Sequence, residues 1–431
     1  MSQIQDWDKK LEIILERLGV NSLNKLEHLL IRSFNGGKLY QHKYHDLLRK
    51  WGSTKGIPIG YHQMFVGHLC QALGFPSNLD YRRVWTSRID EFLSFFPKQF
   101  KGTVINVDVI ENKKYHREWL YDGYIDQKYI YFSIDTVNRW RQLIRNGQYK
   151  LYDICKSALD RFVNSTLWHD LIESGRLCDI VMMGAGSVEK DIILIGSLER
   201  ELLQNNLCIR HTVVDASYYM LTDTLGGLNE YIESNNIASH VDVECYCVDF
   251  ARMDRCNNFL LSRREGGIAV FFIPGGTICN IEEFEFVGAI KKVMRQGDVV
   301  VIGSDFIDDD NLEAYKEKLK TQYDTSDVRD LVIGPIHYLL DKKGIENDRV
   351  KRREMVKINK NSDPNDFNSV KHSVSIDLAI NIDGKDIILS KIKRYNPTYF
   401  REFFVGLGFE YLGEFVGDKS ASYRHVAFRR D

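Results

Sequence analysis

Short apolar runs alternate with longer amphipathic stretches from residue 177 onward. The apolar runs have the length and composition of buried strands, and they cover residues 178–183, 208–214, 241–248, 268–273 and 298–303. The stretches between them are expected to be helices, over residues 190–204, 218–234 and 282–295. Buried strands that alternate with helices predict a parallel, doubly wound α/β sheet.

The pattern changes on both sides of this region. Residues 1–98 are predicted to form short amphipathic helices, and two stretches with a period of two, 103–109 and 129–134, predict a small antiparallel sheet. Helical patterns follow at 136–144 and 151–176. Beyond residue 305 the sequence predicts helices at 311–322 and 327–342, strands at 373–382 and 386–392, a helix at 397–406 and a closing strand at 423–429. The chain therefore divides into an N-terminal, mostly helical α+β module (1–150), the α/β region (151–310) and a C-terminal part (311–431).

Composition excludes several classes of protein. With 431 residues, of which 44% are hydrophobic and 27% charged, the chain is neither disordered nor fibrous. The opening segment has no apolar signal-peptide core, and no apolar run reaches the ~18 residues of a membrane span, so we expect a soluble, cytoplasmic protein. The eight cysteines are scattered, as buried thiols of a reducing compartment are. Zinc sites use wider spacings than that of Cys245 and Cys247, even with Cys256 nearby, and we expect no metal.

Candidate chemistry lies at the carboxyl ends of the predicted strands, where doubly wound sheets bind their ligands. Gly184 and Gly186 follow the first strand and allow a tight turn close to a ligand, but Glu189 stands where a dinucleotide site needs a third glycine. Asp215 ends the second strand and suits the two hydroxyls of a ribose. Asp249 and Phe250 end the third, where a carboxylate and a ring suit adenine. This order is typical of a class I S-adenosylmethionine (SAM) site; helix capping is the alternative role for each acid.

The fourth strand ends in a polar, glycine-rich turn. Gly275 and Gly276 are followed by Thr277 and Asn280, and we expect these residues to form the wall that faces the transferred methyl group. We assign Gly275 to the cofactor and the other three to the substrate. No residue is assigned to catalysis, because no Ser-His-Asp or Cys-His set has a motif around it.

Five segments together resemble the histidine-specific SAM-dependent methyltransferase family, whose best-known member makes trimethylhistidine on the ergothioneine pathway. They are GAGSVEK (184–190), VDAS (214–217), VDF (248–250), PGGTICNI (274–281) and QGDVVVIGSDFIDD (296–309). The resemblance covers about 178–315, and more loosely about 350–430. It implies that residues 151–310 form a Rossmann-like, class I methyltransferase domain and that residues 311–431 form the substrate lobe and the closing strands.

The resemblance also implies roles for single residues. Gly184, Gly186 and Lys190 would lie at the methionine end of the cofactor, Asp215 on its ribose, and Asp249 with Phe250 on its adenine. Asn280 corresponds to the asparagine that holds the carboxylate and amine of the amino-acid substrate. A family tyrosine in the lobe matches Tyr315 or Tyr323, and we favour Tyr315.

Three departures from the family argue against histidine as the acceptor. The family selects imidazole with a glutamate and, two residues later, a serine, whereas this chain has Ser390 and Ile392 there. The missing carboxylate removes a charge-assisted contact of ~1.5–3 kcal/mol. The family's tyrosine-rich segment before the first strand has no counterpart here, and residues 1–150 have no equivalent in short members. Ser390 remains a candidate substrate-binding residue.

These observations predict a SAM-dependent methyltransferase that N-methylates an amine of a small amino-acid-derived molecule or peptide. One alternative is an RNA methyltransferase, because residues 1–150 hold 23 basic and 15 acidic side chains against 35 and 45 in the remainder, although two oppositely charged domains resting on each other would give the same asymmetry. Another is a non-catalytic, cofactor-binding scaffold. A third transfers the aminobutyl group of the same cofactor. The sequence does not define the oligomeric state.

Overall fold

In the computed structural model of the protein, the described residues are 104–106, 130–131, 134–147, 149–205, 207–250, 252–253, 266–307, 350–359, 370, 373–382, 384–417 and 422–431, with scattered positions between 315 and 332. The helices predicted within residues 1–98 lie outside this part. No helix among the described residues is long and apolar enough to cross a membrane.

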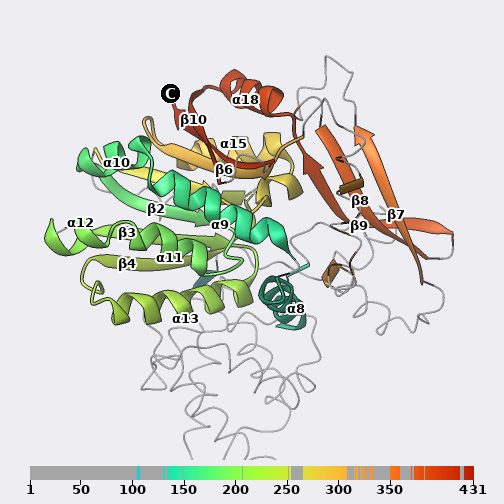
Figure 1. Cartoon of the computed structure of the whole chain (residues 1–431), viewed down its shortest axis with the longest axis horizontal. Coiled ribbons are helices and arrows are strands. Elements are labelled where there is room, and N and C mark those ends of the chain that lie inside the picture. The colour runs from blue at the N-terminus through green and yellow to red at the C-terminus, as the bar shows by residue number, and fades with distance from the viewer. Residues whose placement is uncertain are drawn as a thin grey trace, which may run out of the picture.

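An eight-stranded sheet forms the centre of the structure (Figure 1). Its strand order is β1-β4-β3-β2-β5-β6-β11-β10. The strands are β1 (Val104–Asn106), β2 (Leu177–Met183), β3 (Ile209–Asp215), β4 (Val241–Cys247), β5 (Ile268–Ile273), β6 (Val299–Asp305), β10 (Phe409–Val416) and β11 (Tyr423–Arg430). β11 is antiparallel to both of its neighbours, and the other strands run parallel to one another. The chain leaves β2 in one direction and later returns beside it as β5, so the order reverses between these two strands and opens a crevice at their carboxyl ends.

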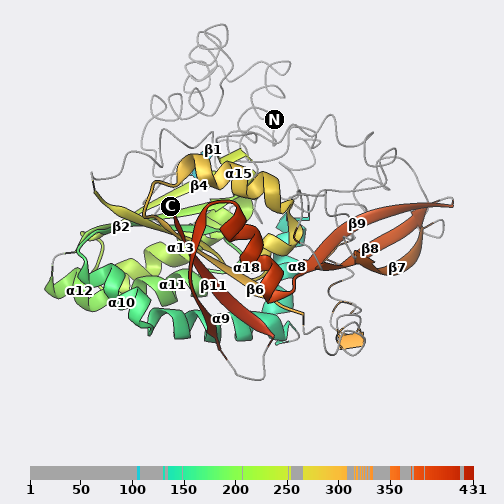
Figure 2. The same cartoon turned by 90° about the horizontal axis from the view of Figure 1, so that it is seen from above.

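Helices cover both faces of the sheet, because the strands are apolar on both sides (Figure 2). One face carries α9 (Lys150–Val163), α10 (Thr166–Glu173), α11 (Glu189–Gly196), α12 (Glu199–Gln204) and α13 (Tyr218–Ser234). The other face carries α15 (Glu283–Val293) and α18 (Pro397–Gly406). Within β2, Ile180 and Met182 belong to the first core, and Val181 and Met183 to the second. Helix α8 (Ile134–Arg145) lies near the carboxyl ends of the strands (Figure 1).

A separate three-stranded antiparallel sheet projects from this body (Figure 1). It consists of β7 (Val350–Asn359), β8 (Ser373–Ile382) and β9 (Lys385–Arg394), in that order. The chain returns from β9 through Tyr395, which forms a bridge with Phe306 just beyond β6. The last residues of β9 therefore lie beside the main sheet.

The structure confirms the predicted α/β sheet and corrects some elements. The antiparallel sheet predicted at 103–109 and 129–134 is wrong: Val104–Asn106 pairs in parallel with β4, and Ile130 and Tyr131 lie in a turn. The helix predicted at 190–204 is two helices, α11 and α12, because the chain turns after Gly196. The stretch 151–176 is also two helices, since Ser165 caps the start of α10. Strands β7 and β10 were not predicted.

Candidate functional site

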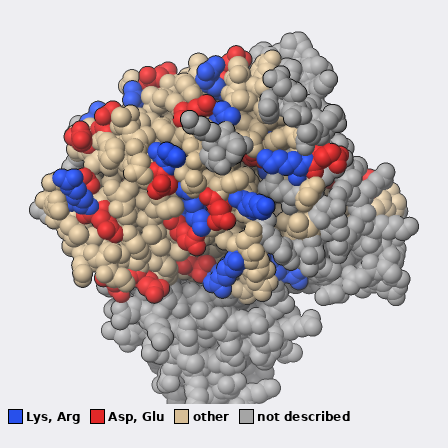
Figure 3. Space-filling view, viewed as in Figure 1, with Lys and Arg blue, Asp and Glu red and all other residues tan. Residues whose placement is uncertain are grey.

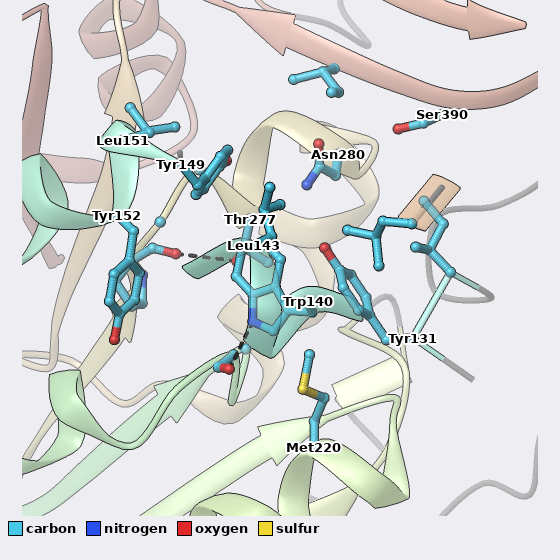
Figure 4. A pocket seen from close by; sticks show the side chains of 18 of the residues that line it. Tyr131, Trp140, Leu143, Tyr149, Leu151, Tyr152, Met220, Thr277, Asn280 and Ser390 are labelled. Atoms are coloured by element: carbon cyan, nitrogen blue, oxygen red, sulfur yellow. Dashed lines mark hydrogen bonds between the residues drawn. The ribbon is translucent and has the colours of Figure 1, made fainter. Parts of the chain in front are cut away.

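A pocket opens at the carboxyl ends of the parallel strands, where the strand order reverses (Figure 4). Eleven of the twelve residues singled out from the sequence line it: Gly184, Gly186, Lys190, Asp215, Asp249, Phe250, Gly275, Gly276, Thr277, Asn280 and Ser390. They come from four strand ends, the short helix η3 (Thr277–Asn280) and strand β9. The topology thus brings together residues that are about 200 positions apart.

The turn after β2 forms one wall of the pocket. Gly184 has φ +96°, and a Cβ there would lie 3.0 Å from Oγ1 of Thr277. Gly186 has φ +51°, and its Cβ would lie 3.2 Å from Nζ of Lys190. Only glycine leaves this space open. Lys190 is 5% exposed and has no ion pair or hydrogen bond with the residues that the structure describes, so its charge is available to a bound anion.

Asp215 is held firmly at the end of β3. Its Oδ2 accepts a hydrogen bond from the N–H of Ala185 (2.9 Å) and its Oδ1 accepts one from the N–H of Ser217 (2.7 Å). Burial raises the pKa of this carboxyl to about 6, although the N–H donors and Lys190 act in the opposite direction. Each oxygen keeps a lone pair, so the carboxylate can still accept from a pair of hydroxyls.

Asp249 and Phe250 follow β4 at the same edge. The N–H of Val248 donates to the carbonyl of Asp215 over 2.9 Å, which ties the two strand ends together. Phe250 is partly buried against the second core. An acid and a ring next to Asp215 are the arrangement expected for the adenosine half of SAM.

The turn after β5 closes the opposite side. Gly275 and Gly276 have φ of +75° and +79°, a backbone conformation that favours glycine. Oγ1 of Thr277 donates to the carbonyl of Pro274 (3.1 Å), and the N–H of Gly275 donates to the hydroxyl of Tyr423 on β11 (2.9 Å). The turn is therefore fixed from within and from the sheet below.

Two polar side chains in the pocket wall lack partners. Oδ1 of Asn280, on η3, and Oγ of Ser390, on β9, are both buried without a hydrogen bond among the described residues. Figure 4 shows both in the upper part of the pocket. A buried polar atom without a partner carries an energetic cost of about 1–3 kcal/mol. A polar ligand would supply the missing hydrogen bonds.

Aromatic residues from before β2 form a wall that the sequence analysis missed. Tyr131, Trp140 and Tyr149 all line the pocket, with Trp140 in the middle (Figure 4). The ring centroids of Trp140 lie 5.7 Å from those of Tyr131 and 5.5 Å from those of Tyr149. Nε1 of Trp140 donates to the carbonyl of Gly186 (2.8 Å), so this wall rests on the glycine turn. The cluster of aromatic residues was visible in the sequence, but no spacing rule assigned it to the site.

Tyr315 is not among the residues that line the pocket. Its hydroxyl donates to Oδ2 of Asp305 (2.9 Å), and the side chain is 7% exposed. Tyr323 lines the pocket instead, and it accepts a hydrogen bond from Arg394. Arg394 is a further lining residue that was missed; it is 1% exposed, and its Nε lies 3.5 Å from Asp305. The number of residues between the end of β6 and each tyrosine did not distinguish Tyr315 from Tyr323.

The described residues contain no group of three or more His, Cys, Asp or Glu side chains arranged for a metal ion. Cys245 is buried in β4, and the thiol of Cys247 donates to the carbonyl of Ala216 (3.5 Å). Burial raises the pKa of the Cys245 thiol, which makes it a poorer ligand. Cys256 lies outside the described residues.

The parallel strands, the antiparallel β11 beside β6 and the site at the reversal of strand order define a class I, Rossmann-like methyltransferase. Residues 140–328 match the model of the family described as histidine-specific, SAM-dependent methyltransferases. The match covers somewhat less than half of the chain, and it indicates that this part is a SAM-dependent methyltransferase domain with SAM as its cofactor. The match ends before β7–β9, the lobe that carries Ser390.

Three solved structures have a similar arrangement of elements. One is an O-methyltransferase family protein from Burkholderia thailandensis (11% identity, 68% of this chain, 58% of that chain, TM-score 0.32). Another is 1,6-didemethyltoxoflavin-N1-methyltransferase of the same organism (9% identity, 68% of this chain, 87% of that chain, TM-score 0.33). The third is the glycopeptide N-methyltransferase MtfA with bound SAM (12% identity, 59% of this chain, 87% of that chain, TM-score 0.29). The chain spans little more than half the length of the first. No curated protein sequence matches it.

Proposed function

We propose that this methyltransferase N-methylates an amine of a small amino-acid-derived molecule or peptide other than histidine. The observation that carries the proposal is the unpartnered Oδ1 of Asn280, buried in the wall of the cofactor pocket. An amide oxygen accepts a hydrogen bond from an N–H group and orients it without taking its charge. We further propose the domain division at residues 150 and 310 and a cytoplasmic location, both of which remain predictions.

The pocket fits the cofactor residue by residue. Lys190 would pair with the methionine carboxylate, since its buried ammonium has no partner among the described residues. Gly184 and Gly186 would let the backbone approach the same end, Asp215 would accept from the ribose, and Asp249 would accept from the adenine. SAM, when bound, supplies an activated methyl group on its sulfonium.

The side chains of the pocket would contribute to methyl transfer mainly by positioning the acceptor and the cofactor. Methyl transfer is an in-line displacement that needs the nucleophile roughly 3 Å from the methyl group and little water nearby. Asn280 and Ser390 would orient the acceptor, and the apolar side chains of Leu331, Val332 and Ile392 would exclude water. Apart from Asp215 and Asp249, the described lining residues include no carboxylate or histidine. We therefore infer that the amine binds in its neutral form.

Strand β9 supports an acceptor other than histidine. Ser390 and Ile392 both line the pocket, as alternate residues of one strand do. The resemblance places them at the positions where the family has a glutamate and a serine. An imidazolium would find no acidic partner at these two positions. On the face drawn in Figure 3, basic and acidic side chains intermix across the described residues, so this face carries no basic patch of the kind that binds RNA.

Calorimetry with SAM, S-adenosylhomocysteine and NAD would test the cofactor part first. We expect one-site binding of the two adenosyl compounds and none of NAD; no binding of SAM would contradict the proposal.

Methyl transfer to a panel of amino acids and short peptides would be measured next. It would compare Asn280→Ala with Asn205→Ala, an exposed control at the end of α12. We expect Asn280→Ala to lower kcat/KM at least tenfold and the control to retain activity. Release of methylthioadenosine would indicate aminobutyl transfer, and binding without turnover would indicate a scaffold.

A further inference from the structure

The aromatic wall of the pocket has the shape of a concave corner. Trp140 meets Tyr131 at an interplanar angle of 78° and Tyr149 at 66°, so three rings at steep angles border one space (Figure 4). All three side chains line the pocket, and two of them come from segments on either side of α8. Trp140 is fixed through its hydrogen bond to Gly186, at the end of the pocket where Lys190 also lies.

These rings remain uncharged. Burial raises the pKa of Tyr131 and Tyr149, so both hydroxyls stay protonated at neutral pH. A neutral aromatic ring carries a negative face, which attracts a cation that has shed its water. Rings arranged at steep angles around a cavity are the usual receptor for an onium group, because such a group has no N–H or O–H to donate.

The two basic side chains that line the pocket, Arg394 and Lys190, are directed to groups other than the aromatic wall. Arg394 is next to Asp305, and its Nη2 donates to Tyr323. Lys190 lies against Gly186 and Gly275, beneath the expected carboxylate of the cofactor. Asp215 lies near Tyr131 and adds negative potential on that side. The positive charge of Arg394 acts on Tyr149, so Asp215 makes the Tyr131 side of the wall the more favourable side for a cation.

We propose that Tyr131, Trp140 and Tyr149 form a cation-binding cage for an onium group, either the sulfonium of the cofactor or the quaternary ammonium of a fully methylated product. This proposal rests on the proposed function. The sulfonium and a quaternary ammonium share a single positive charge wrapped in methyl or methylene groups, so one cage suits both. The cage has a consequence for turnover: it holds the charged cofactor more tightly than the neutral thioether that remains after transfer.

The test is the ratio of the dissociation constants for S-adenosylhomocysteine and SAM, measured by calorimetry on the full-length chain. Tyr149→Leu and Tyr131→Leu remove one ring each, whereas Tyr149→Phe and Tyr131→Phe keep the ring and remove only the hydroxyl. We expect each leucine variant to lower the ratio about three- to tenfold and each phenylalanine variant to leave it unchanged. Because a ratio is compared, a general loss of affinity through misfolding does not imitate the effect.

A second arm distinguishes the two sources of charge. The protein saturated with S-adenosylhomocysteine is titrated with choline and with its neutral isostere 3,3-dimethyl-1-butanol. A ring-dependent preference for choline assigns the cage to the ammonium, and a ring-dependent preference for SAM alone assigns it to the sulfonium. Ratios that do not respond to either leucine variant in both arms overturn the cage. Failure of both adenosyl compounds to bind the unaltered protein would instead contradict the proposed function.

Discussion

The hydroxyl of Tyr423 accepts a hydrogen bond from the backbone N–H of Gly275 over 2.9 Å, although the two residues are 148 positions apart. Tyr423 is buried on β11, and its hydroxyl also donates to Sγ of Cys155 (3.2 Å). The antiparallel strand therefore supports, from below, the glycine turn that lines the pocket. A residue outside the site holds part of the site in place.

Tyr423→Phe should leave the N–H of Gly275 without its acceptor. An unsatisfied buried N–H costs about 1–3 kcal/mol, so the free energy of unfolding should fall by that amount, and SAM affinity should fall about three- to tenfold. Chemical denaturation and calorimetry would measure both. Tyr411→Phe is the matched control on β10, where no hydrogen bond to the hydroxyl is found among the described residues. Equal effects of the two substitutions would argue against this role for Tyr423.

Gly303→Ala should be strongly destabilising. A Cβ at Gly303 would overlap the hydroxyl of Tyr423 and lie 2.9 Å from the ring of His425, both of which are buried. The backbone is flanked by β5 and β11 and cannot move away easily, so we expect a loss of about 3 kcal/mol or more. Thermal unfolding would show it.

Gly288→Ala is the control for that substitution. Gly288 lies on the exposed side of α15, and a Cβ there meets nothing within 4 Å. Alanine in an exposed helix should stabilise by about 0.5–1 kcal/mol. If both variants melted at the same temperature, close packing at Gly303 would be refuted.

Asp215 should make cofactor binding depend on pH. Its pKa of about 6 exceeds the ordinary aspartate value, so the free protein takes up a proton here more readily than the unfolded chain does. The carboxyl thus favours folding most below about pH 4, and this contribution is lost as the pH rises through about 6. Ribose hydroxyls need the ionised form, so SAM affinity should weaken by up to about tenfold per unit below pH 6.

Calorimetry between about pH 5 and 8 would measure this effect. In Asp215→Asn the affinity should be lower and no longer change between about pH 5 and 7. An affinity of the unaltered protein that stays constant over the same range would show that this carboxyl does not meet the ribose.

Lys190→Met should change stability and binding in opposite directions. The buried ammonium of Lys190 has no ion pair or hydrogen bond within the described part of the chain, which is costly, so its replacement by an apolar side chain of similar length should raise the melting temperature of the free protein. SAM would lose its carboxylate partner, and its affinity should fall by about tenfold to a hundredfold. Lys156→Met removes a partly exposed lysine that pairs with Asp153 and Glu189, and it should change both quantities much less than Lys190→Met does. Parallel losses of stability and affinity would contradict the assignment.

The sequence predicted the central sheet closely because its strands carry an unmistakable pattern. β5 and α13 have the predicted bounds, and β2, β3, β4 and β6 differ by one or two residues at an end. The acids at strand ends converge because parallel strands share one edge. Eleven of the twelve chosen residues consequently line one pocket.

The remaining features depend on tertiary contacts that a local pattern does not encode. β10 is half-exposed at the edge of the sheet and lacks the apolar run of a buried strand. Tyr131 and Trp140 precede the sheet, and only the folded chain brings them to Gly186. Arg394 ends β9 like an ordinary solvated residue but is buried by Tyr323 and Asp305. Tyr315 and Tyr323 are both buried, and only the folded chain shows that Tyr323 lines the pocket whereas Tyr315 donates to Asp305.

The position of β11 between β6 and β10 affects how the protein is made. A ribosome that has released β2 to β6 has exposed the glycine turns and both acids, but it has not yet produced the strand that pairs with residues 299–305 and supports Gly275. Until residues 423–430 emerge, one side of β6 offers unpaired backbone groups to other chains. The nascent protein should therefore be most prone to aggregation between the emergence of β6 and that of β11, and cofactor capture should follow the emergence of residues 423–430.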